Sequence, residues 1–173
     1  ARRLVEIRGL DADAATSWMV MDYGEELRAF ISETVRDAIE RHVEAQATWP
    51  AITDCDRLEA ALEELDSAGL IVSAGEAVSL SDARSTLFYA FRERPSARGF
   101  VFYHTQDLDG IEPGELSGLW VGYGAFDDDL QRSRAIGEEV AEALRKSGLS
   151  VEWNGDPAER MVVEMVWRKR WTR

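Results

Sequence analysis

Residues 99–110, which read GFVFYHTQDLDG, mark the place where the chain changes from a helical to an extended pattern. Phe100 to Thr105 form a largely apolar run, which is typical of a strand that is covered on both faces. After Tyr103 the polar side chains His104, Gln106, Asp107 and Asp109 appear in close succession. Two interpretations are open here: a functional site at a strand end, or a strand that simply runs into a solvated loop.

Downstream of this stretch, the pattern predicts a β-β-α-β-β unit. The second strand is expected over 118–126, and a helix follows from the aspartates at 127–129 to about Ser147, because aspartate suits the start of a helix. LSVEWN and MVVEMVW alternate apolar with polar residues, which indicates two more strands. Because NGDPAER turns the chain between them, these last two strands should pair antiparallel.

Upstream, three helical segments are predicted: GEELRAFISETVRDAIERHVEA, DCDRLEAALEELDSAG and SDARSTLFYAFRER. Asp56 and Glu59 have the spacing of a capping box at the start of the second helix, and Gly69 is expected to end it. LIVSAGEAVSL follows as one or two short extended pieces. We therefore expect an α+β protein, with an N-terminal helical portion packed on a C-terminal β-β-α-β-β unit.

The segment RPSARG, residues 94–99, is the best candidate for a boundary. It predicts a mainly helical subdomain over 1–95 and a β-β-α-β-β domain over 98–173. Within the first, segment 54–80 resembles the closing helix and wing of a winged helix. Its would-be recognition helix holds six acidic residues and only one base, Arg57, so structural use is favoured over phosphate contact.

Composition narrows the function classes. The net charge of −13 disfavours a nucleic-acid partner, although the chain ends in the basic run WRKRWTR. That run is interpreted as a solvated terminal strand, with a patch for nucleic acid or an acidic partner as the alternative. No apolar run approaches the roughly 18 residues of a membrane helix. Because Cys55 is the single cysteine, no disulfide framework is expected, and the sequence favours a soluble cytoplasmic protein.

The candidate site lies where the strand at 100–105 ends. The connection to the next strand runs about a dozen residues, which is long for a hairpin. Trp120 begins that next strand, so hairpin geometry places it near His104. The candidate ligand-binding residues are His104, Gln106, Asp107 and Trp120, because an aromatic wall with convergent polar groups suits a small ligand. A hydrogen-bonded, partly buried structural histidine is the favoured alternative for His104.

Other motifs predict no metal and no cofactor. DLDG lacks the regular spacing of a calcium loop. GYGAFDDD places aspartates where a phosphate would bind, so Gly122 and Gly124 are interpreted as making room for close packing. Cys55 lies between two aspartates that raise the pKa of a thiol, so it is not expected to be a nucleophile.

Four runs occur in an order that resembles a known family: DCDRLEAALEELDSAGLIV, RGFVFYHTQD, GLWVGYGAF and AIGEEVAEALRKSGLSVEWNGDPAERMVV. From about residue 20 to its C-terminus, the chain resembles an uncharacterised bacterial family of domain-of-unknown-function proteins. The resemblance implies no established activity, and it suggests that the run from His104 to Asp107 is a family feature. Members often carry a cysteine-rich segment after the GLIV equivalent. Here that segment reads SAGEAVSLSDARS, so the resemblance implies no zinc or redox site in this chain.

Three functions remain open from the sequence. We favour a non-catalytic intracellular binding or interaction module for an unidentified protein or small molecule, because catalytic motifs are missing and aromatic residues are abundant. The alternative is a hydrolase-like enzyme that uses His104 with Asp107. The third is a winged-helix-type DNA-binding regulator.

Overall fold

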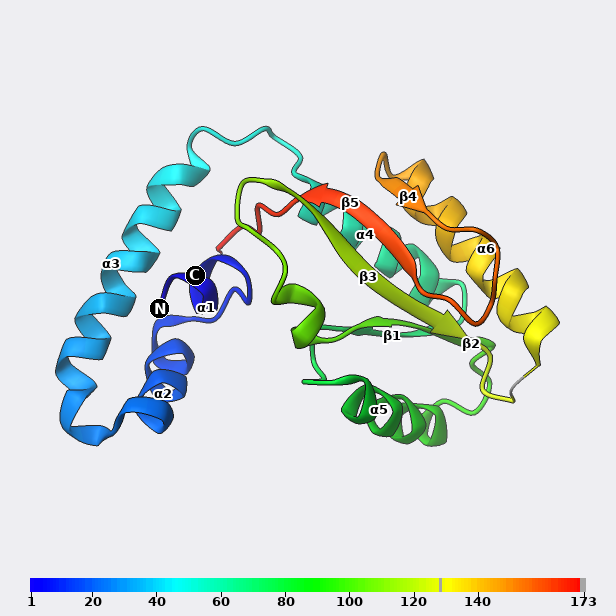
Figure 1. The fold of residues 1–173 in the computed structure, drawn as a ribbon, viewed down its shortest axis with the longest axis horizontal. Helices are drawn as coiled ribbons and strands as arrows, with labels where there is room; N and C mark the ends of the chain where they lie inside the picture. The colour runs from blue at the N-terminus through cyan, green and yellow to red at the C-terminus, as the bar shows by residue number, and fades with distance from the viewer. Residues whose placement is uncertain (128, 172–173) are drawn as a thin grey trace.

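The computed structural model describes residues 1–127 and 129–171. Asp128, one of the aspartates assigned to the helix start, and Arg173 of the terminal basic run lie outside these residues. In Figure 1, a mixed sheet carries helices on both faces, and a helical arm extends from one side of it. The class is α+β, as the sequence predicted.

The sheet has five strands in the order β1-β2-β3-β5-β4. They are β1 (Leu70–Ala74), β2 (Gly99–Tyr103), β3 (Leu116–Gly124), β4 (Ser150–Glu152) and β5 (Met161–Val166). β1 and β2 run parallel, whereas the other neighbouring strands are antiparallel. Together with α6 (Leu130–Lys146), β2 to β5 form the predicted β-β-α-β-β unit, and its last two strands pair antiparallel as expected.

The sheet extends across the boundary that was expected at residues 95–98. β1 lies upstream of it and pairs along its whole length with β2, from Leu70 opposite Gly99 to Ala74 opposite Tyr103. Segment 54–80 is therefore a helix followed by an edge strand of this sheet instead of a helix with a separate wing. The physical reason is the apolar run at 70–72, which is covered by α4 (Asp54–Ser67) on one face and α5 (Leu80–Glu93) on the other.

The remaining helices form the arm. It consists of α1 (Arg2–Glu6), α2 (Ala12–Tyr23), the 3₁₀ turn η1 (Glu25–Leu27) and α3 (Arg28–Gln46). Val5, Ala15, Ile31 and Val35 give the arm a small apolar core of its own, and Trp171 of the C-terminal segment packs against it. Within the described ranges, no helix is both long enough and apolar enough to cross a bilayer.

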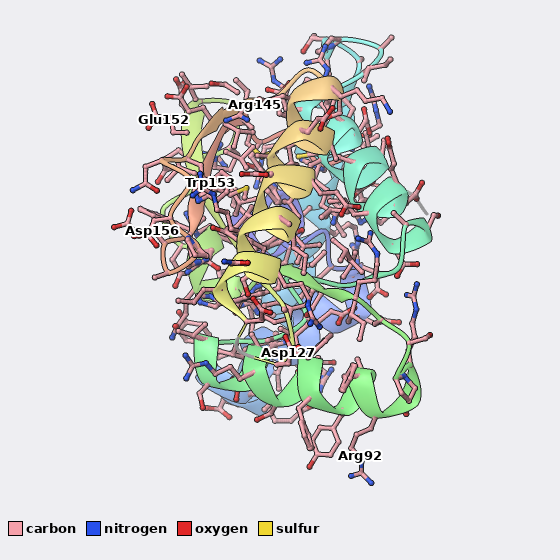
Figure 2. The ribbon with its side chains drawn as sticks, turned by 90° about the vertical axis from the view of Figure 1, so that its right-hand side faces the viewer. Arg92, Asp127, Arg145, Glu152, Trp153 and Asp156 are labelled. Atoms are coloured by element: carbon pink, nitrogen blue, oxygen red, sulfur yellow. The ribbon has the colours of Figure 1, made fainter. Side chains whose placement is uncertain are left out.

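The two faces of the sheet are covered differently. α4 and α6 lie side by side on one face, as Figures 1 and 2 both show, and enclose the largest apolar cluster. α5 covers the opposite face over β1 and β2 only, where it packs on Ile71 and Phe102. Phe102 and Phe100 lie on the glycines of β3: a Cβ at Gly122 would overlap the Phe102 ring, and one at Gly124 would press on Phe100. The glycine pair therefore has the packing role that the sequence suggested.

The run V-E-W-x-G-D-P builds the turn between β4 and β5, at the sheet edge where Figure 2 labels Trp153 and Asp156. The Trp153 ring meets Tyr123 edge to face at 5.4 Å, and its Nε1 donates to the Asp156 carbonyl. The Tyr123 hydroxyl donates to the carbonyls of Asp156 and Glu159. Burial raises the pKa of Tyr123 to about 12, so this hydroxyl remains a donor at neutral pH.

The capping box of α4 begins one turn earlier than predicted. Thr53 is the N-cap, and Asp56 is its partner: the Thr53 N–H donates to Asp56 Oδ2 at 2.7 Å, and the Asp56 N–H donates to Thr53 Oγ1. Burial opposes ionisation of Asp56, but the hydrogen bonds from Thr53 and the nearby Arg170 outweigh it and hold the pKa of this carboxyl below its ordinary value. Asp56 is therefore the N3 residue of the box and not its N-cap as expected, because Thr53, three residues earlier, occupies the N-cap position.

We expect Asp56→Asn to lower the free energy of unfolding by about 1 kcal/mol at neutral pH. Because the folded-state pKa of Asp56 is depressed, the ionised carboxylate stabilises the fold above its unfolded-state pKa. That contribution disappears as the pH falls through the folded-state pKa. Chemical denaturation at neutral and acidic pH measures the change; Asp37→Asn, at an exposed position of α3, is the control. A deficit of equal size at both pH values would contradict this assignment.

Candidate functional site

The 3₁₀ turn η2 (Thr105–Leu108) directly follows β2 and brings His104 and Asp107 together. The His104 backbone N–H donates to Asp107 Oδ2 at 2.8 Å, and His104 Nδ1 lies 3.0 Å from the same oxygen. Both residues are at least nine-tenths buried. The H-x-Q-D spacing is thus a capping arrangement, in which an acid three residues after the N-cap accepts the N-cap N–H.

Arg160, which the sequence reasoning missed, completes this cluster. Its Nη2 lies 2.7 Å from Asp107 Oδ2 and also donates to the Trp120 carbonyl at 2.7 Å. Its guanidinium lies 5.7 Å over the Phe102 ring. Arg160 directly precedes β5, and Met161 pairs with Val121, so the strand order is what carries it to the end of β2. Arg160 could have been predicted as a neighbour of Asp107 only if the pairing of β3 with β5 had been predicted first.

The predicted site residues therefore separate into two groups. His104 and Asp107 meet in the buried cluster, and Trp120 joins it through its backbone carbonyl while 49% of the residue stays exposed. Gln106 is exposed, and its backbone N–H donates to the Val78 carbonyl. None of the cavities described below is lined by any of these four residues.

The His104–Asp107–Arg160 cluster is well suited to hold the structure together. Asp107 neutralises Arg160 and links η2 to the turn before β5. The contact of His104 Nδ1 with Asp107 lacks the direction of a hydrogen bond, and within the described residues neither Nδ1 nor Arg160 Nε has a hydrogen-bond partner. The Asp107 carboxylate is occupied by Arg160 and the His104 N–H, and it does not line any of the cavities described, so the cluster offers little for hydrolysis.

The other side of η2 lines a cleft between the arm and the sheet, which we call the junction cleft. It comprises two adjoining cavities of about 220 and 240 Å³. Both are lined by Ile7, Arg8, Trp18, Thr105 and Leu108. The first also reaches residues 74–76 and Tyr103, at the carboxyl ends of the parallel strands β1 and β2. Ligands of open α/β sheets commonly bind beyond such strand ends.

Aromatic side chains and cations share the walls of the junction cleft. Trp18, Tyr103 and Trp167 line it together with Arg8 and Lys169. The Arg8 guanidinium lies 4.9 Å over the Trp18 ring, and no ion pair of Arg8 occurs in the described part of the chain. Lys169 Nζ lies 3.6 Å from Glu59 Oε1. Arg8 is therefore a cation held in place by an indole and without a carboxylate.

Two further groups in the cleft are suited to donate hydrogen bonds. Trp167 is 3% exposed, and its Nε1 has no hydrogen-bond partner among the described residues. Burial raises the pKa of the Tyr103 hydroxyl well above its ordinary value, so this group stays protonated at neutral pH. One acid, Glu76, lines the first cavity and lies 3.4 Å from Ser73 Oγ, and two further acids, Asp22 and Asp109, line the second.

Long-range hydrogen bonds fix the walls of the cleft relative to one another. Arg3 donates to the carbonyls of Leu108, Asp109 and Ile111, which fixes α1 against the loop after η2. On the opposite wall, His42 Nε2 lies 2.9 Å from the Lys169 carbonyl, which joins α3 to the C-terminal segment. Three segments that are distant in the sequence therefore meet around one cavity.

A larger cavity, of about 820 Å³, lies elsewhere, between α2, α3 and Trp171. Its charged residues are of mixed sign: Asp13, Arg28, Arg36, Glu40 and Glu44. Arg28 is already paired with Glu25. Three of these five residues are acids and one of the two arginines is already paired, so this cavity is less suited to an anionic ligand than the junction cleft.

Metal and thiol chemistry find little support in the described residues. Within residues 1–127 and 129–171, no three His, Cys, Asp or Glu side chains are grouped closely enough to hold a metal ion. Cys55 is buried, and burial raises the pKa of its thiol to about 12. At neutral pH the thiol is therefore protonated and a weak nucleophile.

A family model described as "Domain of unknown function (DUF6891)" matches residues 3–171. No curated protein and no solved structure matches the chain.

Proposed function

This chain belongs to the family described as domain of unknown function DUF6891, and we propose that it is a non-catalytic binding module. Its ligand is a small aromatic carboxylate, which occupies the junction cleft. The proposal keeps the binding role that the sequence favoured. It moves the ligand from the His104 side of η2 to the opposite side, where Thr105 and Leu108 line the cleft.

The observation that carries the proposal is the placement of Arg8, which lies over Trp18 and makes no ion pair among the described residues. Several described arginines make no ion pair, and among these Arg8 is the one that is stacked on an aromatic ring. Arg8 is held over Trp18, inside a cleft with further aromatic walls. A guanidinium with aromatic neighbours recognises a planar anion through charge-assisted hydrogen bonds, while the rings bury the apolar part of the ligand.

Binding fits the cleft better than catalysis does. The donors around it are Arg8, Lys169, Tyr103 and the Trp167 N–H, and each of them is suited to hold an anion. The Thr105 hydroxyl donates to the Val78 carbonyl and is not free to attack a substrate. The second candidate, a hydrolase built on His104 and Asp107, lacks support from the cavities described here. DNA binding through α4 remains disfavoured by the acidic side chains of that helix.

We also propose that the protein acts in the cytoplasm of a bacterium. The single cysteine, which is buried and protonated, is consistent with a reducing compartment but does not by itself distinguish compartments. Cell fractionation with an antibody against the protein tests this part of the proposal. Recovery from the periplasm or the membrane fraction would contradict it.

Ligand binding is tested with benzoate and indole-3-acetate, each compared with its neutral amide. We expect the carboxylates to shift the amide NMR signals of residues around the cleft, and the amides to bind more weakly. Arg8→Gln should raise the dissociation constant of the carboxylates by about tenfold, the typical effect of losing a charged hydrogen bond. Isothermal titration calorimetry and NMR titration measure the dissociation constant of each ligand for the unchanged protein and for the variant.

Arg41→Gln is the matched control, since Arg41 is exposed on α3 and does not line the cleft. It removes the same charge and should leave the dissociation constants unchanged. Equal loss of affinity in both variants would mean that net charge, and not the cleft, attracts the ligand. Equal affinity for a carboxylate and its amide would remove the anionic ligand from the proposal.

A further inference from the structure

A second surface lies at the free edge of β1, on the other side of α4 from α6. β1 ends the strand order, so β2 occupies only one of its two edges. Arg98 N–H donates to the Gly69 carbonyl, and Gly75 N–H donates to the Tyr103 carbonyl, so the backbone groups of odd-numbered residues face β2. In a parallel pair, alternate residues direct their backbone groups to opposite edges. The N–H and C=O groups of Val72 and Ala74 therefore face away from the sheet.

A groove of about 530 Å³ runs beside these unpaired groups. Leu62, Val72 and Ala74 supply its apolar side chains, and Ser67 also lines it. Three acidic side chains of α4 form its rim: Glu59, Glu63 and Asp66. The residues that direct backbone groups outward are thus the same residues of β1 that line the groove.

Arg94 closes one end of the groove. Its guanidinium lies 2.7 Å from Asp66 Oδ1 and also donates to the Leu70 carbonyl, the first outward-facing carbonyl of β1. The Leu70 carbonyl and Asp66 are therefore already occupied. Beyond them, Glu63 makes no ion pair among the described residues, and the edge at Val72 and Ala74 carries no proline or lysine. Natural proteins commonly use such residues to block strand addition at an exposed edge.

We propose that this edge accepts an extended basic segment of a partner protein, which adds to β1 as a further strand. Main-chain hydrogen bonds to Val72 and Ala74 would provide the pairing, and alternate apolar side chains of the segment would enter the groove over Leu62. Its lysine or arginine side chains would face Glu59 and Glu63. The net charge of −13 favours approach of a basic partner, because long-range attraction raises the association rate.

A second copy of the chain fits this edge less well than a basic segment. Antiparallel pairing of β1 with another β1 would bring two acidic rims of α4 toward each other, and like charges at close range oppose association. The proposed occupant is therefore a partner of opposite charge.

The probe is the peptide acetyl-KVKVKVK-amide, compared with acetyl-EVEVEVE-amide, in an NMR titration of the full chain. We expect the basic peptide to shift the amide signals of Val72 and Ala74 and to slow their hydrogen exchange, and the acidic peptide to do neither. Glu63→Lys should weaken binding of the basic peptide by about fivefold or more, as expected for reversing one rim charge. Glu33→Lys, an equal charge change at an exposed position of α3, should leave binding unchanged.

Val72→Pro removes the outward N–H without breaking the β1–β2 ladder, because proline is tolerated where the N–H faces solvent at an edge. It should abolish binding while the unfolding transition stays cooperative. If that variant does not fold, Glu63→Lys still tests whether the basic peptide binds beside the acidic rim. The proposal would be overturned if both peptides bound with the same affinity, or if Glu63→Lys and Glu33→Lys lost the same affinity for the basic peptide. It would also be overturned if the Val72 and Ala74 amide signals did not change, or if the chain formed a dimer that Val72→Pro dissociates. Arg8→Gln should not affect peptide binding, so this surface is tested independently of the junction cleft.

Discussion

Replacing Asp107 with alanine is expected to lower the free energy of unfolding by about 3 kcal/mol, as for other buried ion pairs that lose one partner. The Asp107 side chain is 6% exposed and lies 2.7 Å from Arg160. Its removal leaves the guanidinium without its carboxylate and the buried His104 N–H without its acceptor. It also disconnects η2 from the turn before β5. Guanidinium chloride denaturation followed by circular dichroism measures the loss.

Asp109→Ala is the control for this variant. Asp109 is exposed two residues farther along, and the contact that ties it to the fold is made by its backbone carbonyl, which accepts from Arg3. Its loss should change the free energy of unfolding by less than about 0.5 kcal/mol. If Asp107→Ala is equally mild, the cluster is not a stabilising element, and a functional role for His104 and Asp107 gains ground again.

Gly99→Ala is expected to lower the free energy of unfolding by about 3 kcal/mol, near the upper end of the usual cost of overpacking. A Cβ at this position would overlap both the Gly124 carbonyl oxygen and the Ile136 side chain. The carbonyl belongs to β3 and cannot move without disturbing its pairing with β2, and Ile136 is a buried core residue of α6. Thermal and chemical unfolding measure the change.

Gly110→Ala provides the comparison, because no atom lies within 4 Å of the Cβ that it would add, and Gly110 is not among the glycines with a positive φ. It should be neutral or slightly stabilising, since alanine restricts the unfolded chain more than glycine does. A similar loss in both variants would mean that glycine flexibility, and not the contact of β2 with β3 and α6, determines the cost.

The sequence predicted the elements well wherever local pattern determines them. The alternation in residues 149–153 and 161–167 gave two strands, and the leucine stripe of residues 58–65 gave a helix, because one face of each had to be buried. The interpretation of Gly122 and Gly124 as packing positions also follows from pattern, since small residues on a strand face leave room for neighbouring rings.

Local sequence pattern predicted only part of the candidate site. The spacing of His104 and Asp107 is local, and it brought both residues into one turn. Arg160 and Arg8 were not found, because each reaches its neighbours through pairing or docking of distant segments. Arg160 depends on β5 lying beside β3, and Arg8 depends on the arm lying against the ends of β1 and β2.

By itself, the sequence determined the α+β class and the positions of the β-β-α-β-β elements, since hydrophobic periodicity acts over a few residues. Tertiary structure alone decided that β1 joins the sheet beside β2, and that the polar end of β2 is closed by Arg160 on one side and opens into the junction cleft on the other. The physical reason is that strand order and arm docking depend on contacts between segments far apart in the chain. No local pattern encodes which of the possible partners a strand edge or a cation will meet.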